Sequence, residues 1–245
     1  MIVVIITRED ERVTAPTLVA CSHGTRDPAG RRAVAALVAA VRAARPTLDV
    51  HEAFVDVQEP AAAEVVRQVC DSGGSAVVVP LLLSTGYHVG VDIADAVRGQ
   101  RATAAPALGP DLRVTSVLLQ RLREAGLRPD DAVLVAAAGS SDPRATADVA
   151  AAVDAVAVEH PGPVSAGFGA SASPSVPEAV AAARRDHPGR RVVVAAYLLA
   201  PGHFLGRLHE AGADVVSDAL LADVPTELVD VVLDRFDAAA VTLER

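Results

Sequence analysis

The sequence predicts an α/β protein made of two similar α/β/α halves, each built on a parallel β-sheet with helices on both faces. Three observations point to this fold class: short Val-rich runs alternate with longer Ala-rich stretches, these runs are apolar throughout, and landmarks recur at a nearly constant offset. Continuously apolar strands are typical of parallel sheets that lie between two layers of helices. A core of Ala, Val and Leu also fits a composition that is 51% hydrophobic but only 2% aromatic.

The elements of the first half alternate between strand and helix, as a series of βαβ units requires. Strands are predicted at residues 17–21, 50–57 and 76–83, and helices at residues 31–44, 60–71, 91–98 and 112–126. A strand at residues 132–138 opens the second half. Because a helix follows each strand, neighbouring strands are expected to run parallel.

The second half repeats landmarks of the first. These are Asp27-Pro28 and Asp142-Pro143 at an offset of 115, Phe54, Pro60 and Glu64 against Phe168, Pro174 and Glu178 at 114, and the valine runs at residues 77–79 and 192–194 at 115. Asp-Pro pairs and Phe are uncommon in this chain, so similarity from composition alone is the weaker explanation. We therefore predict a duplicated unit, with halves at residues 1–128 and 129–245 and the boundary near residues 127–131.

Composition and charge exclude several classes of partner. The net charge is −9, which argues against nucleic acid or an anionic membrane but leaves room for an acidic small molecule beside a few local arginines. No window reaches about 18 apolar residues without charge, and the apolar run at residues 1–7 is too short for a signal peptide or membrane span. Cys21 and Cys70 form neither a disulfide framework nor a paired metal-ligand spacing. We expect a cytoplasmic protein without membrane association, as a monomer or small homo-oligomer.

Two histidines of the first half follow predicted strands, and each has a glycine nearby. His23 stands in the run Ser22-His23-Gly24-Thr25-Arg26-Asp27-Pro28, and His88 ends the run Leu83-Ser84-Thr85-Gly86-Tyr87-His88. Because open parallel sheets bind ligands beyond the carboxyl ends of their strands, both histidines are expected at one edge of one sheet. A histidine in such a place is also a common structural hydrogen-bonding group, so both alternatives stay open at this point.

A pair of imidazoles suits both metal and proton chemistry. Neutral imidazole binds Fe, Co, Ni and Zn, and it accepts protons near neutral pH. Asp56 and Glu59 end the second predicted strand and are candidates to complete a metal site. The alternatives are that Asp56 caps the helix at Pro60 and that Glu59 is a solvated surface residue.

Three segments in this order, SHGTRDP from residue 22, AFVDVQEP from residue 53 and PLLLSTGYHVGVDI from residue 80, resemble the CbiX/SirB group of sirohydrochlorin chelatases. The resemblance covers nearly the whole chain, including the duplicated half of the longer members. It implies a class II chelatase fold with the active-site cleft between the halves. It also implies a lyase-class, ATP-independent insertion of Fe²⁺ or Co²⁺, with Ni²⁺ as a further candidate, into sirohydrochlorin for siroheme or cobalamin biosynthesis.

The resemblance also implies site residues. The two metal-binding histidines of the family match His23 and His88, which are expected to act in catalysis as well. The family usually has Glu where this chain has Asp56, so direct metal ligation by this shorter carboxylate stays open. The candidate set for the carboxylate-rich rim of the substrate is Ser22, Gly24, Thr25, Arg26, Ser84, Thr85, Gly86, Tyr87 and His203. An ion pair with Asp27 is the alternative for Arg26.

The second half departs from this pattern. Ala137-Ala138-Gly139 stands where the first half has Ser22-His23-Gly24. Alignment on the valine runs sets His203 opposite His88, whereas alignment on Gly86 and Gly202 sets it opposite Tyr87. We expect one active site in the first half, with the second half as the opposite wall of the cleft. The four remaining histidines are expected at the surface: His51, His160, His187 and His209.

Other functions fit the sequence less well than a chelatase does. Histidine phosphatases also carry His-Gly after a first strand, but they need Arg immediately before the histidine, where this chain has Ser22. Hydrolase and nucleotide-dependent functions lack their Gly-x-Ser-x-Gly, phosphate-loop and Gly-x-Gly-x-x-Gly motifs. A non-catalytic protein that binds the tetrapyrrole or delivers the metal remains the alternative of a different class.

Overall fold

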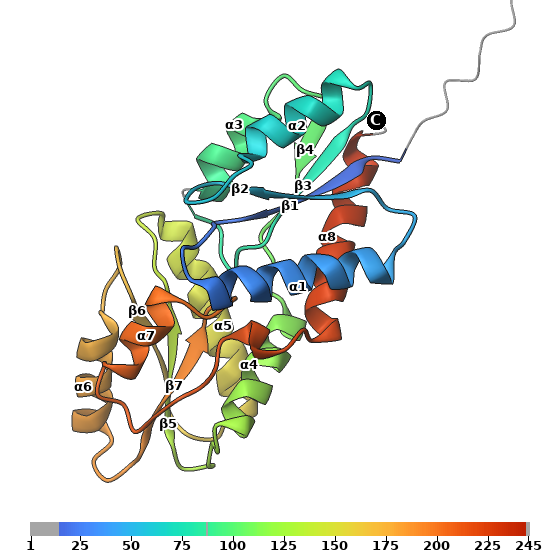
Figure 1. Ribbon diagram of the computed structural model, residues 1–245. Helices are drawn as coiled ribbons and strands as arrows, with labels where there is room; N and C mark the ends of the chain where they lie inside the picture. The colour runs from blue at the N-terminus through green and yellow to red at the C-terminus, as the bar shows by residue number, and fades with distance from the viewer. Residues whose placement is uncertain (1–14, 87, 244–245) are drawn as a thin grey trace, which may run out of the picture.

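The computed structural model describes residues 15–86 and 88–243, which form two α/β units stacked along the long axis of the molecule (Figure 1). The first sheet has the strand order β2-β1-β3-β4 and the second has β6-β5-β7-β8, and all neighbouring strands are parallel. The strands are β1 Thr17–Ser22, β2 Val50–Phe54, β3 Ala76–Pro80, β4 Ala102–Ala104, β5 Ala132–Ala137, β6 Val164–Phe168, β7 Val192–Tyr197 and β8 Val215–Val216. The predicted fold class is confirmed.

Helices cover both faces of each sheet. They are α1 Pro28–Ala44, α2 Ala62–Asp71, the π-helix η1 His88–Ile93, α3 Ala94–Val97, α4 Leu112–Glu124, α5 Pro143–Glu159, α6 Val176–Asp186, α7 His203–His209, the 3₁₀-helix η2 Leu220–Ala222 and α8 Thr226–Leu243. In the first unit α2 and α3 pack on one face of the sheet, with Val66 and Ile93 fully buried there. In the second unit α6 and α7 cover one face, and α5 packs against the other.

The two sheets repeat one another strand by strand. Leu18 of β1 lies opposite Val50 of β2, and Val133 of β5 lies opposite Val164 of β6. The isolated bridge between Phe54 and Ala61 also recurs, between Phe168 and Ser175. β3 and β7, the third strands of the two halves, are related by a different offset from the one that the valine runs suggest. Thr17 pairs with Ala76, whereas Ala132 pairs with Val192, so β7 corresponds to β3 at an offset of 116 rather than 115.

The repeated Asp-Pro pairs mark the starts of α1 and α5. The Asp27 carboxylate accepts hydrogen bonds from the amides of Ala29 and Gly30, and the Asp142 carboxylate accepts one from the amide of Arg144. An acidic N-cap followed by proline stabilises the first turn of a helix. This cap starts the first helix at Pro28, three residues before the predicted start at Arg31.

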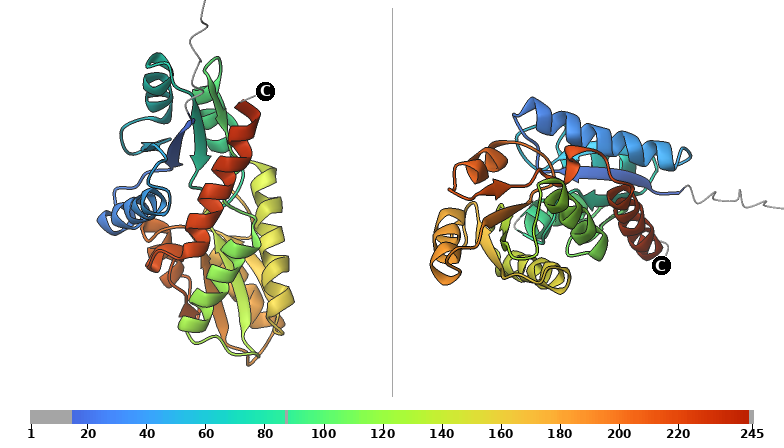
Figure 2. Two further views of the ribbon diagram at one scale, coloured as in Figure 1. Left: turned by 90° about the vertical axis from the view of Figure 1, so that its right-hand side faces the viewer. Right: turned by 90° about the horizontal axis from the view of Figure 1, so that it is seen from below.

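α4 and α8, the last helices of the two halves, each pack against the unit formed by the other half. α8 lies against α1, β3 and β4 of the first unit, whereas α4 lies against α5 and β7 of the second (Figure 1, and the left view of Figure 2). One continuous apolar core joins both units, and it includes Leu118 of α4 and Val231 of α8. The packing therefore crosses the predicted bounds of 1–128 and 129–245, because each terminal helix covers the sheet of the other half.

Two predicted strands end early and leave loops at the same edge of the sheet. β2 ends at Phe54, since the next residues turn with Val57 at φ 62° and the amide of Gln58 donates to the carbonyl of Asp56 at 2.6 Å. β3 ends at Pro80 rather than residue 83. The helix predicted at residues 91–98 begins instead at His88, as η1 followed by α3.

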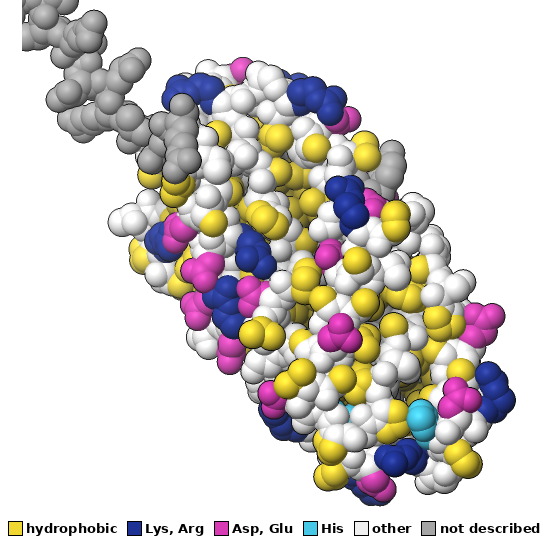
Figure 3. Space-filling view, turned by 180° about the vertical axis from the view of Figure 1, so that it is seen from behind, with side chains coloured by type: hydrophobic (Ala, Val, Ile, Leu, Met, Phe, Trp, Pro, Cys, Tyr) yellow, Lys and Arg dark blue, Asp and Glu magenta, His cyan; other side chains and the backbone are white. Residues whose placement is uncertain are grey.

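The surface carries both signs of charge close together. On the face in Figure 3, basic and acidic side chains are interspersed over described parts of the chain. Ion pairs also join separate elements, including Arg45 at the end of α1 with Asp237 of α8 and Arg113 of α4 with Asp234 of α8. Within the described residues, no helix is long and apolar enough to cross a membrane.

Candidate active site

A cavity of about 810 Å³ opens between the two units, at the carboxyl ends of their central strands. Both halves line it, with the loops after β1 and β3 on one side and the loops after β5 and β7 on the other. A volume in this range suits a ligand of several hundred daltons. The cavity therefore lies where the sequence analysis expects the active-site cleft.

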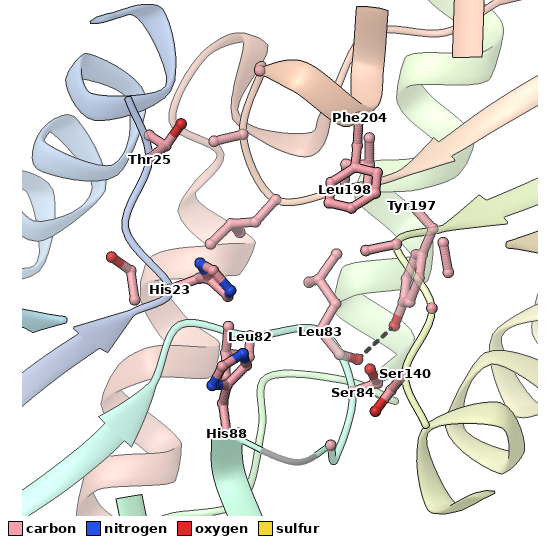
Figure 4. A pocket seen from close by; sticks show the side chains of 18 of the residues that line it. His23, Thr25, Leu82, Leu83, Ser84, His88, Ser140, Tyr197, Leu198 and Phe204 are labelled. Carbon is pink, nitrogen blue, oxygen red and sulfur yellow. Dashed lines mark hydrogen bonds between the residues drawn. The ribbon is translucent and has the colours of Figure 1, made fainter. Parts of the chain in front are cut away.

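The structure brings the two predicted histidines together. The ring centroids of His23 and His88 lie 4.6 Å apart, with the ring planes at 86° to one another. Figure 4 shows both rings on one side of the cavity, while Leu198 and Phe204 lie on the other. Residues from the ends of two different strands thus form one site, although 65 positions separate them in the sequence.

Gly24 allows the turn that presents His23. Its φ is +88°, and a Cβ atom there would lie 2.3 Å from the carbonyl oxygen of Asp56. Only glycine fits both the positive φ and this close approach of backbone. Nδ1 of His23 lies 3.2 Å from the carbonyl oxygen of Gly24, and since a carbonyl only accepts, this contact favours the tautomer with hydrogen on Nδ1.

His88 is oriented by a residue that the sequence analysis missed. Its Nδ1 lies 2.6 Å from Oδ2 of Asp92, four residues later on η1. A carboxylate on one ring nitrogen fixes the tautomer, so the lone pair of the neutral ring is on Nε2. In the sequence, the i, i+4 spacing of His88 and Asp92 indicates such a contact only if both residues lie on one helix. The predicted helix begins at residue 91, so it does not include His88.

The structure does not bring Asp56 and Glu59 to the histidines. Neither lines the cavity, and the Asp56 carboxylate accepts a hydrogen bond of 2.7 Å from the amide of Val57. Asp56 also does not cap α2, whose N-cap is Ala61. Among the described residues, no group of three or more His, Cys, Asp or Glu side chains could enclose a metal ion. Asp56 and Glu59 thus stand apart from the two imidazoles in the described structure.

Most of the predicted rim residues line the cavity. They are Ser22, Gly24, Thr25, Arg26, Ser84, Gly86 and His203. Ser22 is only 4% exposed, and His203 is the first residue of α7. Thr85 does not line the cavity, and its amide donates to the Asp148 carboxylate at 2.6 Å. Tyr87 lies outside the described residues.

The cavity has an electrostatic character unlike that of the whole chain. Among the described lining residues there is no Asp or Glu, and Arg26 is the one guanidinium, although the chain carries a net charge of −9. Within the described part of the chain Arg26 has no carboxylate within 4.0 Å, because Asp27 caps α1 instead. This wall therefore favours an anionic ligand over a cationic one.

The second half has lost both histidines. Ala138 occupies the position of His23 at the cavity wall. The amide of Gly90 donates to the carbonyl of Gly86, and the amide of Gly206 donates equivalently to the carbonyl of Gly202. This repeat sets Phe204 at the position of His88 and His203 at that of Tyr87, in agreement with the offset of 116 between β3 and β7. Ser140 and Tyr197 of the second half also line the cavity, and no motif in the sequence had singled them out.

One histidine outside the site differs from its prediction. His160, expected at the surface, is 4% exposed, and its Nε2 lies 2.9 Å from the carbonyl oxygen of Asp131. Gly162 makes the room, since a Cβ atom there would lie 2.5 Å from that ring nitrogen. His51 and His209 are exposed as expected, and His187 is partly exposed.

Solved structures of two chelatases are similar to this chain. SirB from Bacillus subtilis with Fe³⁺ superposes with a TM-score of 0.77 at 21% identity, covering 94% of this chain and 98% of that one. The sirohydrochlorin chelatase SirB from Bacillus subtilis subspecies spizizenii in complex with cobalt gives 0.75 at 20% identity, covering 94% and 97%. At these identities the likeness shows the fold.

A third structure shares the fold within a longer chain. DR2241 from Deinococcus radiodurans, a multi-domain protein with structural similarity to chelatases, gives a TM-score of 0.66 at 20% identity, covering 90% of this chain and 55% of that one. A comparison of the sequence with curated proteins found no match.

The family model named CbiX matches both halves of the sequence, at residues 17–125 and 132–231. The two matched segments agree with the duplication seen in the sheets, and together they span most of the chain. The protein therefore belongs to the CbiX family.

Proposed function

We propose that this member of the CbiX family is a metal chelatase that inserts Fe²⁺ or Co²⁺ into sirohydrochlorin, with His23 and His88 as the residues that handle the metal. The observation that carries the proposal is the contact of the two imidazole rings at the wall of a shared cavity, 4.6 Å between centroids. Membership of the CbiX family and the similarity to SirB, which is known in complexes with Fe³⁺ and cobalt, support a metal chelatase.

An open two-imidazole site suits a metal that must leave again. A structural metal site is closed by four protein ligands, whereas a site for metal in transit keeps positions for water or substrate. In the proposed mechanism, Nε2 of His23 and of His88 each replace one water of the incoming ion. The remaining positions stay open for the pyrrole nitrogens of the macrocycle, so that the metal passes between ligands without regaining its water shell.

Insertion also releases two protons from the pyrrole nitrogens. Once the metal has moved to the macrocycle, Nε2 of each imidazole can accept one of them. Asp92 stabilises the imidazolium that His88 then becomes, because its carboxylate lies 2.6 Å from Nδ1. The same two side chains therefore serve as ligands before the transfer and as bases after it.

Arg26 and the hydroxyl groups of the rim are proposed to bind the carboxylates of sirohydrochlorin. Arg26 lines a cavity that has no acidic residue among its described lining, and Ser22 at the end of β1 and Ser84 in the loop after β3 add hydroxyl donors. The macrocycle itself fits against the apolar lining, which includes Leu82, Leu198 and Phe204 (Figure 4).

The proposal includes ATP independence, since the reaction as written requires only ligand exchange and proton transfer. It also places the protein in the cytoplasm, where free thiols such as those of Cys21 and Cys70 persist. Purified protein, mixed with sirohydrochlorin and Co²⁺ or Fe²⁺ without ATP, should speed the absorbance change of metal insertion well above the spontaneous rate. If it binds sirohydrochlorin or the metal but leaves the spontaneous rate unchanged, it is a binding or delivery protein instead.

A further inference from the structure

The segment that leads to His88 is held by the second half of the chain. The hydroxyl group of Tyr197, at the end of β7, donates a hydrogen bond of 3.2 Å to the carbonyl oxygen of Leu83 (Figure 4). The carboxylate of Asp148, on α5, accepts a hydrogen bond of 2.6 Å from the amide of Thr85. Two polar side chains of the second half thus fix the backbone three and five residues before His88.

These two contacts have no counterpart in the first half. α1 and α5 correspond at an offset of 115, because Asp27 and Asp142 cap them, and this offset sets Ala33 at the position of Asp148. Strand register pairs Cys21 with Pro80 and Ala136 with Ala196, so Leu81 stands at the position of Tyr197. Neither Ala33 nor Leu81 has a side-chain group that could form such a hydrogen bond. The second half, which has lost both histidines, carries polar groups that the histidine-bearing half does not.

The Tyr197 contact lies in a space shaped to hold it. Tyr197 is 3% exposed, and burial raises the pKa of its hydroxyl group well above the ordinary value, so the group stays a donor at neutral pH. A Cβ atom on Gly109 would lie 2.3 Å from this hydroxyl oxygen and 2.4 Å from the carbonyl oxygen of Leu83. Gly109 therefore leaves room for the hydrogen bond where any larger residue would separate the two atoms.

We infer that Asp148 and Tyr197 are positioning residues that hold His88 against His23, and that this is what the degenerate second half contributes to metal handling. The inference rests on the proposed role of the two histidines as metal ligands. A pair of ligands binds an ion tightly only when both stay at the required separation. Because His23 follows β1 directly whereas His88 follows a longer loop after β3, the position of His88 needs support from outside its own half.

Binding of Co²⁺ to the protein without tetrapyrrole tests this inference. Titrations should compare the wild type with Tyr197→Phe, Asp148→Ala and the double variant Tyr197→Phe/Asp148→Ala. Tyr197→Phe keeps the ring in the core, and Asp148 lies at the surface edge of α5, so the fold should persist; thermal unfolding checks this. Asp154→Ala is the matched control, because Asp154 is an exposed carboxylate elsewhere on α5.

The double variant should bind Co²⁺ about tenfold or more weakly than the wild type, as is typical when residues that orient metal ligands are removed. Replacement of Asp148 by Asn instead of Ala (Asp148→Asn) should restore Co²⁺ binding, because the side-chain amide oxygen of Asn also accepts a hydrogen bond from the Thr85 amide. Amide hydrogen exchange should speed up at residues 81–86 and stay unchanged at β1. A double variant that binds Co²⁺ within twofold of the wild type would overturn the inference. Failure of the proposed function looks different, since the wild type would then bind Co²⁺ yet not accelerate insertion.

Discussion

Nδ1 of His88 lies 2.6 Å from Oδ2 of Asp92, within η1, the π-helix that begins at His88. The pair is about one-third exposed, with 34% for the His88 side chain and 37% for that of Asp92, so solvent reaches both side chains. The contact fixes which ring nitrogen carries hydrogen and which way the ring faces. Asp92 is therefore a partner of His88 in the candidate site, apart from the two histidines that are proposed to bind the metal.

Removal of the Asp92 carboxylate should impair metal handling more than folding. Asp92→Ala should lower the rate of metal insertion by about 10- to 100-fold, because His88 loses both its fixed tautomer and the partner of its imidazolium form. Asp92→Asn should retain more activity, since its amide oxygen still accepts from Nδ1. Initial rates at several Co²⁺ concentrations check this, with Asp95→Ala on α3 as the control. Equal rates for Asp92→Ala and the wild type would remove Asp92 from the mechanism.

A methyl group at Gly24 should harm both stability and activity. In Gly24→Ala the alanine has a positive φ, and its Cβ atom would lie 2.3 Å from the carbonyl oxygen of Asp56. The turn that presents His23 must therefore move. Gly99→Ala is the matched control, since its φ is +73° but no atom lies within 4 Å of the added Cβ. Chemical unfolding should show a loss of about 1–2 kcal/mol for the control, the ordinary cost of positive φ, and a larger loss for Gly24→Ala. If both variants were destabilised equally and both stayed active, close packing at Gly24 would not position His23.

Arg26 should act on substrate binding rather than on the chemical step. Arg26→Gln should raise KM for sirohydrochlorin several-fold while kcat changes little, because a guanidinium that binds a peripheral carboxylate contributes uniformly to ground state and transition state. The difference from the wild type should shrink as salt is added, since screening weakens the same contact. Arg32→Gln, an exposed change on α1 outside the cavity, serves as the control. A fall in kcat with an unchanged KM would contradict this role.

Acid should destabilise the second unit through Asp131, whose carboxylate binds Arg191 beside the start of β7. Burial alone would raise the pKa of Asp131, but hydrogen bonds from Arg191 and from the amide of Arg128 lower it below its ordinary value. A lowered pKa in the folded state means that the stabilisation is complete above the ordinary pKa and is lost as pH falls through the lowered value. Asp131→Asn should therefore reduce the free energy of unfolding by about 2 kcal/mol at pH 7, as is typical of hydrogen bonds to charged groups. Denaturant titrations below pH 4 should show the two proteins converging; a constant difference would refute the assignment.

The sequence predicted those features of the fold that local pattern controls. Apolar runs predicted β1, β3 and β5, and the offsets of 114 and 115 predicted the duplication. The exchange of α4 and α8 was not predicted, because which sheet a helix covers depends on packing across both halves rather than on its own residues. Likewise, the sequence placed His23 and His88 at one edge, since parallel strands bring their carboxyl ends together. It missed Tyr197 and Asp148, whose partners are backbone atoms 114 and 63 positions away.

One asymmetric site in the first half is proposed to handle the metal, and variants of its single histidines probe this role. The rate of Co²⁺ insertion into sirohydrochlorin without ATP should be compared for His23→Ala, His88→Ala and His203→Ala, each shown by circular dichroism to be folded. The first two variants should each lose at least about 100-fold of the rate, because catalysis by positioned acid–base groups is typically of that order. His203→Ala should keep most of the rate, since its position corresponds to Tyr87 and not to a metal-handling histidine. Active His23→Ala and His88→Ala proteins together with an inactive His203→Ala protein would contradict the claim.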